Sequence, residues 1–312
     1  MSRVATFSAA TTLLALAAVL TLIGVGEAEG ALPVWQALVL GIVQGLTELL
    51  PVSSSGHLIL VPWLGEWTYL EQHDAFNQTF DVALHLGTLV AVVAYFRKDI
   101  AELAVALVGS IARRRIRTPA ERVAWVVAVA TVPAAVVGAL GEPLIATSLG
   151  EPWQIAIFLA VFAVVLWLAD RRPERKAMDG VGLWGAFGIG CAQALALMPG
   201  VSRSGVTISA ARFLGLTRDE AARLSFLLLA PIVLGAVLLK GVTDVLLGDL
   251  PAGWKGPFLI GTLTAAGSGL LAIEALLGYV RRHDYSAFVV YRLVVAAVVL
   301  LLIAGGVRDA TF

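Results

Sequence analysis

The stretch QGLTELLPVSSSGH, residues 44–57, ends one apolar run at a break rich in Pro, Ser and Gly and at once begins another. The stretch PGVSRSGVT, residues 199–207, interrupts the second half of the sequence in the same way. The apolar runs beside these breaks are shorter than the roughly 20 residues that a helix needs to cross a bilayer. Each break therefore predicts a re-entrant helical hairpin, a form tolerated at membrane depth where it is buried in protein or lines a wet cavity.

The composition of the whole chain is that of a membrane protein. Of its 312 residues, 59% are apolar and 14% are charged, compared with roughly 25% charged residues in soluble domains. The mean hydropathy is +0.89, and apolar blocks of about twenty residues, the length of a spanning helix, recur along the sequence. The sequence therefore predicts an all-α polytopic membrane protein and excludes a soluble fold.

Charge and cysteine content exclude several partners. Lys plus Arg and Asp plus Glu are equal at 22 each, so the chain lacks the basic field with which proteins bind nucleic acid. The single Cys191 cannot form an intrachain disulfide, and one thiol is too few for a structural zinc site. We therefore expect the bilayer and a lipid as partners, and neither nucleic acid nor an organic cofactor. A homodimer is compatible with the sequence, which does not fix the oligomeric state.

The two breaks belong to an internal duplication. Shifting the sequence by 149 residues aligns them with eight identities in twenty positions, one of which pairs Ser53 with Ser202. Each unit then holds one hairpin followed by three spanning helices, in repeat halves of about 33–170 and 182–306. Inverted repeats of this kind place their binding site near the bilayer midplane, between the halves. We therefore expect the site where the two hairpin tips meet.

Basic residues mark one side of the membrane. The loops around 113–117, 171–176 and 281–282 are rich in Arg, whereas the loops on the other side hold a single Lys and no Arg. Because cytoplasmic loops carry an excess of Lys and Arg, we place the basic loops inside. The two hairpins are then predicted to enter the membrane from opposite faces.

The first residues of the chain lie outside the repeat. Residues 1–32 precede the single integral membrane domain predicted for 33–312, and their apolar run exceeds the roughly 7 to 15 residues of a secretory signal core. We expect an extra N-terminal hydrophobic helix that stays as an anchor, with a cleaved signal as the alternative.

Ionisable groups inside apolar blocks are expensive and mark candidate sites. Gln44 and Glu48 are four residues apart, which places both side chains on one face of a helix. A carboxylate and an amide oxygen suit a hard cation such as Mg²⁺ or Ca²⁺ that bridges protein to phosphate. The pair therefore predicts a metal site, and the alternative is a polar pair used only for helix packing.

The serines and the histidine at the first break allow two interpretations. Ser53, Ser54 and Ser55 stand where serine often caps a helix and bonds its free amides. Ser54 and His57 are three residues apart, so the imidazole is also placed to accept the proton of a serine nucleophile. His85, in contrast, is expected to be a packed, hydrogen-bonded side chain.

The second break carries an arginine that membrane burial does not explain. Arg203 lies between two serines, and a guanidinium at membrane depth is costly unless it meets an anion, which for phosphate it binds with two parallel hydrogen bonds. The alternative is a structural salt bridge between Arg203 and Glu48. Further hydroxyl groups predicted to bind phosphate are supplied by the neighbouring residues Ser202, Ser204 and Thr207.

An oxygen-ligand metal site, an arginine clamp and a Ser/His pair inside the membrane together indicate phosphoryl transfer on a lipid phosphate. The two break motifs resemble the signatures of bacterial undecaprenyl-diphosphate phosphatases of the bacitracin-resistance type. The resemblance extends from about residue 33 to 306 and includes FDVALHLGT at 80–88 and LSFLLLAP at 224–231.

This resemblance implies removal of the terminal phosphate from undecaprenyl diphosphate, which recycles the carrier lipid for peptidoglycan synthesis and confers bacitracin resistance. It also implies a bacterial inner-membrane protein whose site opens to the outer side. Carried over by position, the catalytic residues are Ser54 as nucleophile, His57 as general acid/base, and Glu48 and Arg203. The metal ligands are Gln44 and Glu48. The phosphate-binding groups are Ser53, Ser202, Arg203, Ser204 and Thr207.

Two alternatives to these roles remain open at this point. His57 as nucleophile, or direct attack by water, fits the same residues. A lipid-phosphate transporter or scramblase fits the same inverted repeat, because broken helices are also the architecture of alternating access.

Overall fold

The computed structural model describes residues 2–24, 31–240 and 253–311, and its regular elements there are helices. In chain order they are α1 Arg3–Leu22, α2 Val34–Leu49, α3 Ser54–Gly65, α4 Thr68–Gln72, α5 Asp74–Tyr95, α6 Arg97–Arg113, α7 Pro119–Ser148, α8 Pro152–Asp170, η1 Met178–Gly180, α9 Leu183–Leu195, α10 Arg203–Phe213, α11 Arg218–Lys240, α12 Lys255–Val280 and α13 Ser286–Ala304.

Seven helices in the described part of the chain are long and apolar enough to cross a membrane. They are α1, then α5, α7 and α8 after the first break, and α11, α12 and α13 after the second. The all-α polytopic class is therefore confirmed, and the order of one hairpin followed by three spans occurs twice. The inverted symmetry of the two halves and the domain limits at 33–312 stay predictions.

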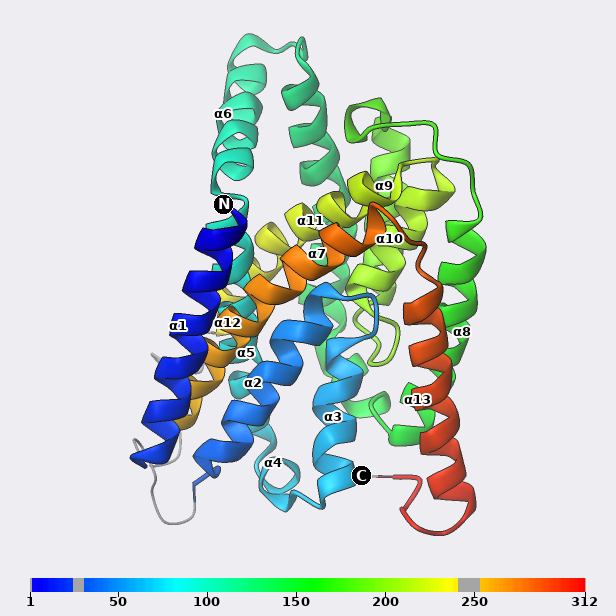
Figure 1. The fold of residues 1–312 in the computed structure, drawn as a ribbon. Coiled ribbons are helices and arrows are strands. Elements are labelled where there is room, and N and C mark those ends of the chain that lie inside the picture. The colour runs from blue at the N-terminus through cyan, green and yellow to red at the C-terminus, as the bar shows by residue number, and fades with distance from the viewer. Residues whose placement is uncertain (1, 25–30, 241–252, 312) are drawn as a thin grey trace.

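A pair of short helices flanks each break, as the predicted hairpins require, and their re-entrant placement in the membrane stays a prediction. α2 and α3 have 16 and 12 residues, and α9 and α10 have 13 and 11, so none reaches the roughly 20 residues of a span. In Figure 1 both arms of the first hairpin run to the lower end of the bundle, and their break lies near mid-height.

The basic connections lie together at one end of the molecule. Figure 1 shows the α6–α7, α8–α9 and α12–α13 connections at the upper end, whereas α4 and the α7–α8 connection lie at the lower end. The charge pattern of the sequence thus separates the two ends as expected.

Helix α6 is an element that the sequence analysis did not predict. It packs against the start of α7, and the two helices extend beyond the rest of the bundle in Figure 1. Ile100 and Leu103 pack against the main apolar core. The turn into α7 is fixed by the Glu121 carboxylate, which accepts hydrogen bonds from Arg113 Nη2 at 2.5 Å and from the backbone N–H of Arg117 at 2.6 Å.

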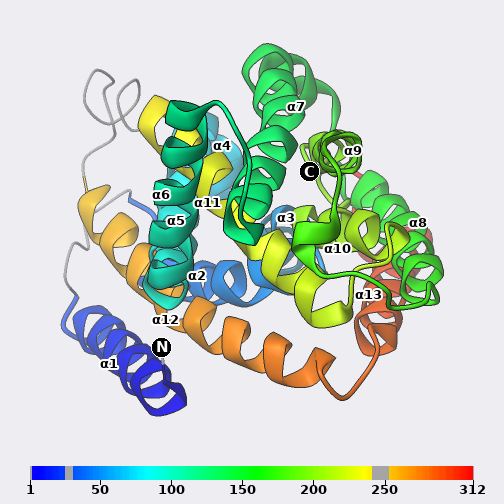
Figure 2. The same ribbon diagram turned by 90° about the horizontal axis from the view of Figure 1, so that it is seen from above.

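Helix α12 is the inner support of the first hairpin. It lies between α1 and α2 in Figure 2, and the backbones of α2 and α12 approach so closely that a Cβ atom at Gly45 would overlap Ser268 Oγ and Ala265 O. Glycine is needed at such a close approach. On the other side of α12, α1 packs through the buried Ala10 and Ala17; retention of this anchor stays a prediction.

Candidate active site

The two breaks adopt the same unusual backbone conformation. Ser53 has φ 76° and ψ 94°, and Ser202, its counterpart in the repeat, has φ 78° and ψ 113°. Positive φ is uncommon for residues other than glycine and costs about 1–3 kcal/mol. Each serine offsets part of this cost by capping the following helix, because Ser53 Oγ accepts from Gly56 N at 3.4 Å and Ser202 Oγ accepts from Gly205 N at 3.1 Å.

The hairpin tips meet, as expected, and serines join them. Gly200 N donates to Ser53 Oγ at 3.1 Å, and Ser204 Oγ donates to the Leu50 carbonyl at 2.8 Å. Each break therefore supplies a hydrogen-bonding group to the other. This reciprocal pair places the first residue of α3 and the first residue of α10 beside the same space.

A third element, α13, holds both tips through a residue that the sequence interpretation missed. Arg292 is fully buried, and its guanidinium donates to the carbonyls of Pro51 at 3.3 Å, Gly200 at 3.0 Å and Val201 at 3.1 Å. Carbonyls at breaks lack helical partners, so the arginine satisfies them. The available signal was a lone arginine in an otherwise apolar span, which marks a candidate site in a membrane protein.

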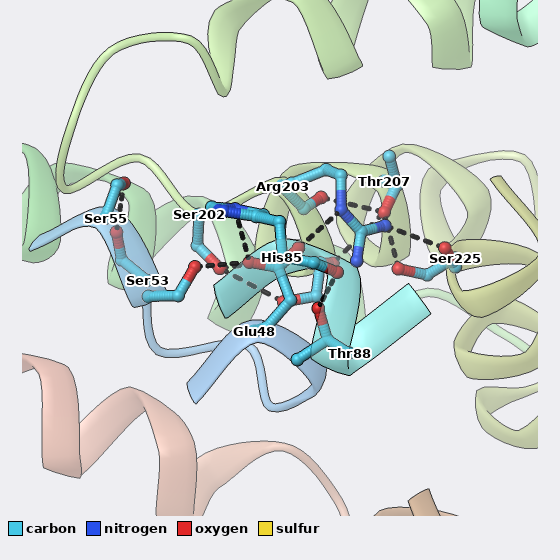
Figure 3. Close-up of polar contacts among 12 residues, drawn as sticks. Glu48, Ser53, Ser55, His85, Thr88, Ser202, Arg203, Thr207 and Ser225 are labelled. Carbon is cyan, nitrogen blue, oxygen red and sulfur yellow. Dashed lines mark hydrogen bonds and ion pairs between the residues drawn. The ribbon is translucent and has the colours of Figure 1, made fainter. Parts of the chain in front are cut away.

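Glu48, at the end of α2, is the centre of the polar contacts. Its Oε1 lies 3.1 Å from Arg203 Nε, and its Oε2 accepts a short hydrogen bond from Ser54 Oγ. His85 Nε2, from α5, lies 3.5 Å from the same Oε2. Figure 3 shows Glu48, His85 and Arg203 grouped together. The salt bridge considered for Arg203 and Glu48 is therefore present, and it joins the two hairpins.

Arg203 keeps one donor nitrogen free of this salt bridge. Its Nη1 donates to the Ser225 carbonyl at 2.8 Å, whereas Nη2 is buried and has no hydrogen-bond partner within the described ranges. Buried polar groups are normally satisfied, and an exception requires an explanation. Because Arg203 lines a cavity, a ligand with acceptor oxygens would satisfy the free nitrogen.

The cavity beside Glu48 has a volume of about 260 Å³. Its polar lining consists of Glu48, Ser54, Ser55, Asp81, His85, Gln193 and Arg203, and its apolar lining comes from α5, α7, the α9–α10 break and α11. The wall combines two carboxylates, a hydroxyl pair, an imidazole and a guanidinium. The polar lining thus suits a phosphate group and its charge-balancing partners, and the apolar lining suits hydrocarbon.

His57 lies apart from this cavity wall. Its Nδ1 bonds the Ser53 carbonyl at 2.7 Å and its Nε2 lies 2.8 Å from Tyr291 Oη, on which the ring stacks. Both ring nitrogens are therefore engaged, and Ser54 is paired with Glu48 instead of His57. The direct Ser54–His57 contact considered from the sequence is not formed; the catalytic roles of both residues stay predictions.

The hydroxyls predicted to bind phosphate form hydrogen bonds within the protein. Thr207 Oγ1 lies 2.8 Å from Ser225 Oγ, and Ser202 Oγ lies 3.2 Å from Ser204 Oγ. Of the predicted phosphate-binding residues, Arg203 lines the cavity, whereas the phosphate contacts of Ser53, Ser202, Ser204 and Thr207 stay predictions. The polar wall residues that the sequence did not assign to the site are Ser55, Asp81, His85 and Gln193.

The predicted metal ligands Gln44 and Glu48 lie side by side. Gln44 Nε2 lies 3.4 Å from Glu48 Oε2, and Gln44 Oε1 is buried with no hydrogen-bond partner in the described residues. An unpaired amide oxygen beside a carboxylate fits a hard cation that also binds substrate phosphate. No group of three or more His, Cys, Asp or Glu side chains in the described ranges could hold an ion by itself.

Comparison with known proteins places this site in a family. The family model described as bacitracin resistance protein BacA matches residues 37–298. An undecaprenyl-diphosphatase of Geobacter metallireducens is 49% identical over 269 residues, which cover 86% of this chain and 97% of that protein. The undecaprenyl-diphosphatase of Rubrobacter xylanophilus is 46% identical over 271 residues, again with 86% and 97% covered. Both breaks and every polar residue of the cavity wall lie inside the matched region, and the chain therefore belongs to the BacA family.

Proposed function

We propose that the protein dephosphorylates undecaprenyl diphosphate to undecaprenyl phosphate and inorganic phosphate. The observation that carries this function is the buried, unpaired Nη2 of Arg203, a residue that lines a cavity with both charged and apolar walls. Its family members are named undecaprenyl-diphosphatases. The reaction would recycle the carrier lipid used in peptidoglycan synthesis and so confer resistance to bacitracin.

In this proposal Arg203 binds the terminal phosphate and neutralises charge that develops during transfer, which is the main requirement for phosphoryl transfer. The guanidinium is held in place by Glu48 and by the Ser225 carbonyl. It therefore meets the phosphate without reorganisation. His85 Nε2 lies 3.5 Å from Glu48 Oε2, the oxygen that accepts the hydrogen bond from Ser54.

Ser54 is our candidate nucleophile. Its Oγ forms the bond to the terminal phosphorus, its proton passes to Glu48 Oε2, and the bond from that phosphorus to the bridging oxygen breaks. Undecaprenyl phosphate leaves with the electron pair, and water then hydrolyses the phosphoserine. A role for His57 as general acid/base or as nucleophile requires its ring to leave Tyr291, and direct attack by water requires neither residue as nucleophile.

Mg²⁺ or Ca²⁺ held by Glu48 and Gln44 is part of the proposal. A bound cation would supply further charge neutralisation for the phosphate oxygens. The buried, unpaired Gln44 Oε1 supports this assignment.

We place the protein in the bacterial inner membrane with the basic end of the bundle in the cytoplasm. The support is the excess of Arg in the connections at that end and the preference of such loops for the cytoplasmic side. The first hairpin then starts and ends on the outer side, from which the proposed site is entered. A homodimer remains a prediction.

The test is phosphate release from undecaprenyl diphosphate by the full-length protein purified in detergent. Arg203→Ala should lower kcat by more than about a thousandfold, by the magnitudes typical of arginine clamps in phosphoryl transfer. The matched control is Arg282→Ala, which removes an exposed arginine of the α12–α13 connection and should leave kcat unchanged. EDTA should reduce release, and added Mg²⁺ or Ca²⁺ should restore it.

Other outcomes of this test separate the parts of the proposal. Absence of release by well-folded wild-type protein would contradict the hydrolase and favour the lipid transporter. Undiminished phosphate release in EDTA would contradict the proposed metal site but not the proposed hydrolase activity.

A further inference from the structure

A second cavity, of about 450 Å³, lies between α5, α6, α7 and α11. Its wall is almost entirely apolar, with Leu89 and Val93 from α5, Leu103 from α6, Ala128 from α7, and Leu227 and Ala230 from α11 among the lining residues. We call it the apolar groove. Nothing in the proposed chemistry uses it.

The apolar groove continues from the phosphate cavity along the same three helices. On α5, His85 lines the phosphate cavity and Leu89, one turn later, lines the groove. On α7 the corresponding neighbours are Ala134 and Thr131, and on α11 they are Val233 and Ala230. Residues three or four apart are adjacent on a helix face, so each of the three walls passes directly from one space to the other.

The substrate class proposed above has the same two-part character. A polyprenyl diphosphate has a charged head joined to a long isoprenoid chain, and burying each CH₂ group of such a chain contributes about 0.8 kcal/mol. A wall that changes from polar to apolar within one helical turn matches the junction between head and chain.

We infer that the apolar groove binds the isoprenoid chain of the substrate beyond its first isoprene unit, while the terminal phosphate lies against Arg203. This inference rests on the proposed function. The fourth wall, α6, distinguishes the groove from an ordinary lipid-facing surface, because Ile100 and Leu103 line the groove and also pack against the core.

The chain would then run from the hairpin tips towards the basic end of the bundle, because the groove-lining residues of α5, α7 and α11 lie nearer that end than the cavity-lining ones. A lipid whose head enters from the outer side would then extend its chain through the protein, between α5, α6, α7 and α11.

The test compares a long and a short substrate in the same variants. Ala128→Trp fills the groove from α7, and Val132→Trp, one turn away, adds the same ring at a side chain that is 55% exposed. For Ala128→Trp we expect the KM for undecaprenyl diphosphate to rise about tenfold, the equivalent of roughly two CH₂ groups displaced. Hydrolysis of dimethylallyl diphosphate, which has a single isoprene unit, should be unchanged, and Val132→Trp should behave as wild type with both substrates.

A second groove variant, Leu103→Trp, tests the wall formed by α6 and serves if Ala128→Trp does not fold. Unchanged KM for the long substrate in folded groove variants would overturn the inference and leave the groove to bilayer lipid only. Equal loss with both substrates would also overturn it, since the defect would then lie in the chemistry. Failure of wild-type protein to hydrolyse either substrate would instead contradict the proposed function.

Discussion

Glu48 is the residue on which the candidate site depends most. Its two carboxylate oxygens contact groups from three other helices: Ser54 at the start of α3, His85 on α5 and Arg203 at the start of α10. A carboxylate can accept several hydrogen bonds at once, so one side chain orients the proposed nucleophile and the proposed phosphate clamp together. Removing its charge would affect both.

At this scale we predict that Glu48→Gln lowers kcat by at least about a hundredfold, within the range for loss of a proton acceptor. The amide keeps the shape but cannot accept a proton from Ser54 or neutralise Arg203. Initial rates of phosphate release measure the effect, and Glu66→Gln, at a carboxylate whose side chain is 72% exposed, is the control. A Glu48→Gln enzyme with wild-type turnover would contradict the role of this carboxylate.

At the scale of elements, the two breaks are a repeated structural solution. Ser53 and Ser202 share a strained backbone and a capping hydrogen bond, and Ser53 also accepts a hydrogen bond from the other tip. Their strain is retained because the surrounding hydrogen bonds fix it. The breaks therefore act as rigid supports for the residues that follow them, Ser54 and Arg203.

At Ser53 the backbone conformation lowers the stability of the fold, whereas the side chain raises it through its capping hydrogen bond. Ser53→Ala loses the capping oxygen, at a cost of about 0.5–2 kcal/mol, and keeps the positive φ. Ser53→Gly loses the same oxygen but adopts positive φ freely. We expect the glycine variant to be more stable than the alanine variant by about 1 kcal/mol, measured by thermal unfolding in detergent. The same order is expected at Ser202, and the reverse order at either position would contradict the strain.

The elements also show how far the sequence alone could lead. The hairpins followed from local chemistry, because Pro, Gly and Ser end helices wherever they occur together and the flanking runs are too short to span. The orientation of His57 did not, because its partner Tyr291 is 234 residues away in sequence. His85 was expected only to pack, since nothing near it in the sequence reveals that Glu48 faces it. Arg292 carried a usable signal, its charge within an apolar span, that was not used.

At the scale of the whole molecule, a buried ion network joins the helices at the basic end of the bundle. Asp170, at the end of α8, accepts from Arg218 Nε at 2.7 Å and from the backbone N–H of Tyr285 at 3.0 Å. Arg212 Nε lies 3.3 Å from the same carboxylate, and its side chain is 1% exposed. The network connects α8, α10, α11 and the start of α13, away from the phosphate cavity.

We predict that Asp170→Asn destabilises the protein by about 3–5 kcal/mol, because it removes the buried counter-charge of Arg212 and leaves only the half-exposed Glu174 near it. Thermal unfolding in detergent should show the loss, while kcat per folded molecule stays at the wild-type value. Glu174→Gln is the control, since this partner of Arg212 and Arg218 is 41% exposed and its pairs contribute at most about 1 kcal/mol. Equal stability of the two variants would show that the network is not a support of the fold.

The contacts of Arg292 also have a consequence for biosynthesis. The arginine binds carbonyls at Pro51, Gly200 and Val201, yet it leaves the ribosome long after the first hairpin has entered the translocon. Until the last helix is inserted, those carbonyls have to be satisfied by water or by other temporary partners, because unbonded backbone groups are costly inside a bilayer. A nascent chain therefore lacks this support of its hairpin tips until α13 has been synthesised.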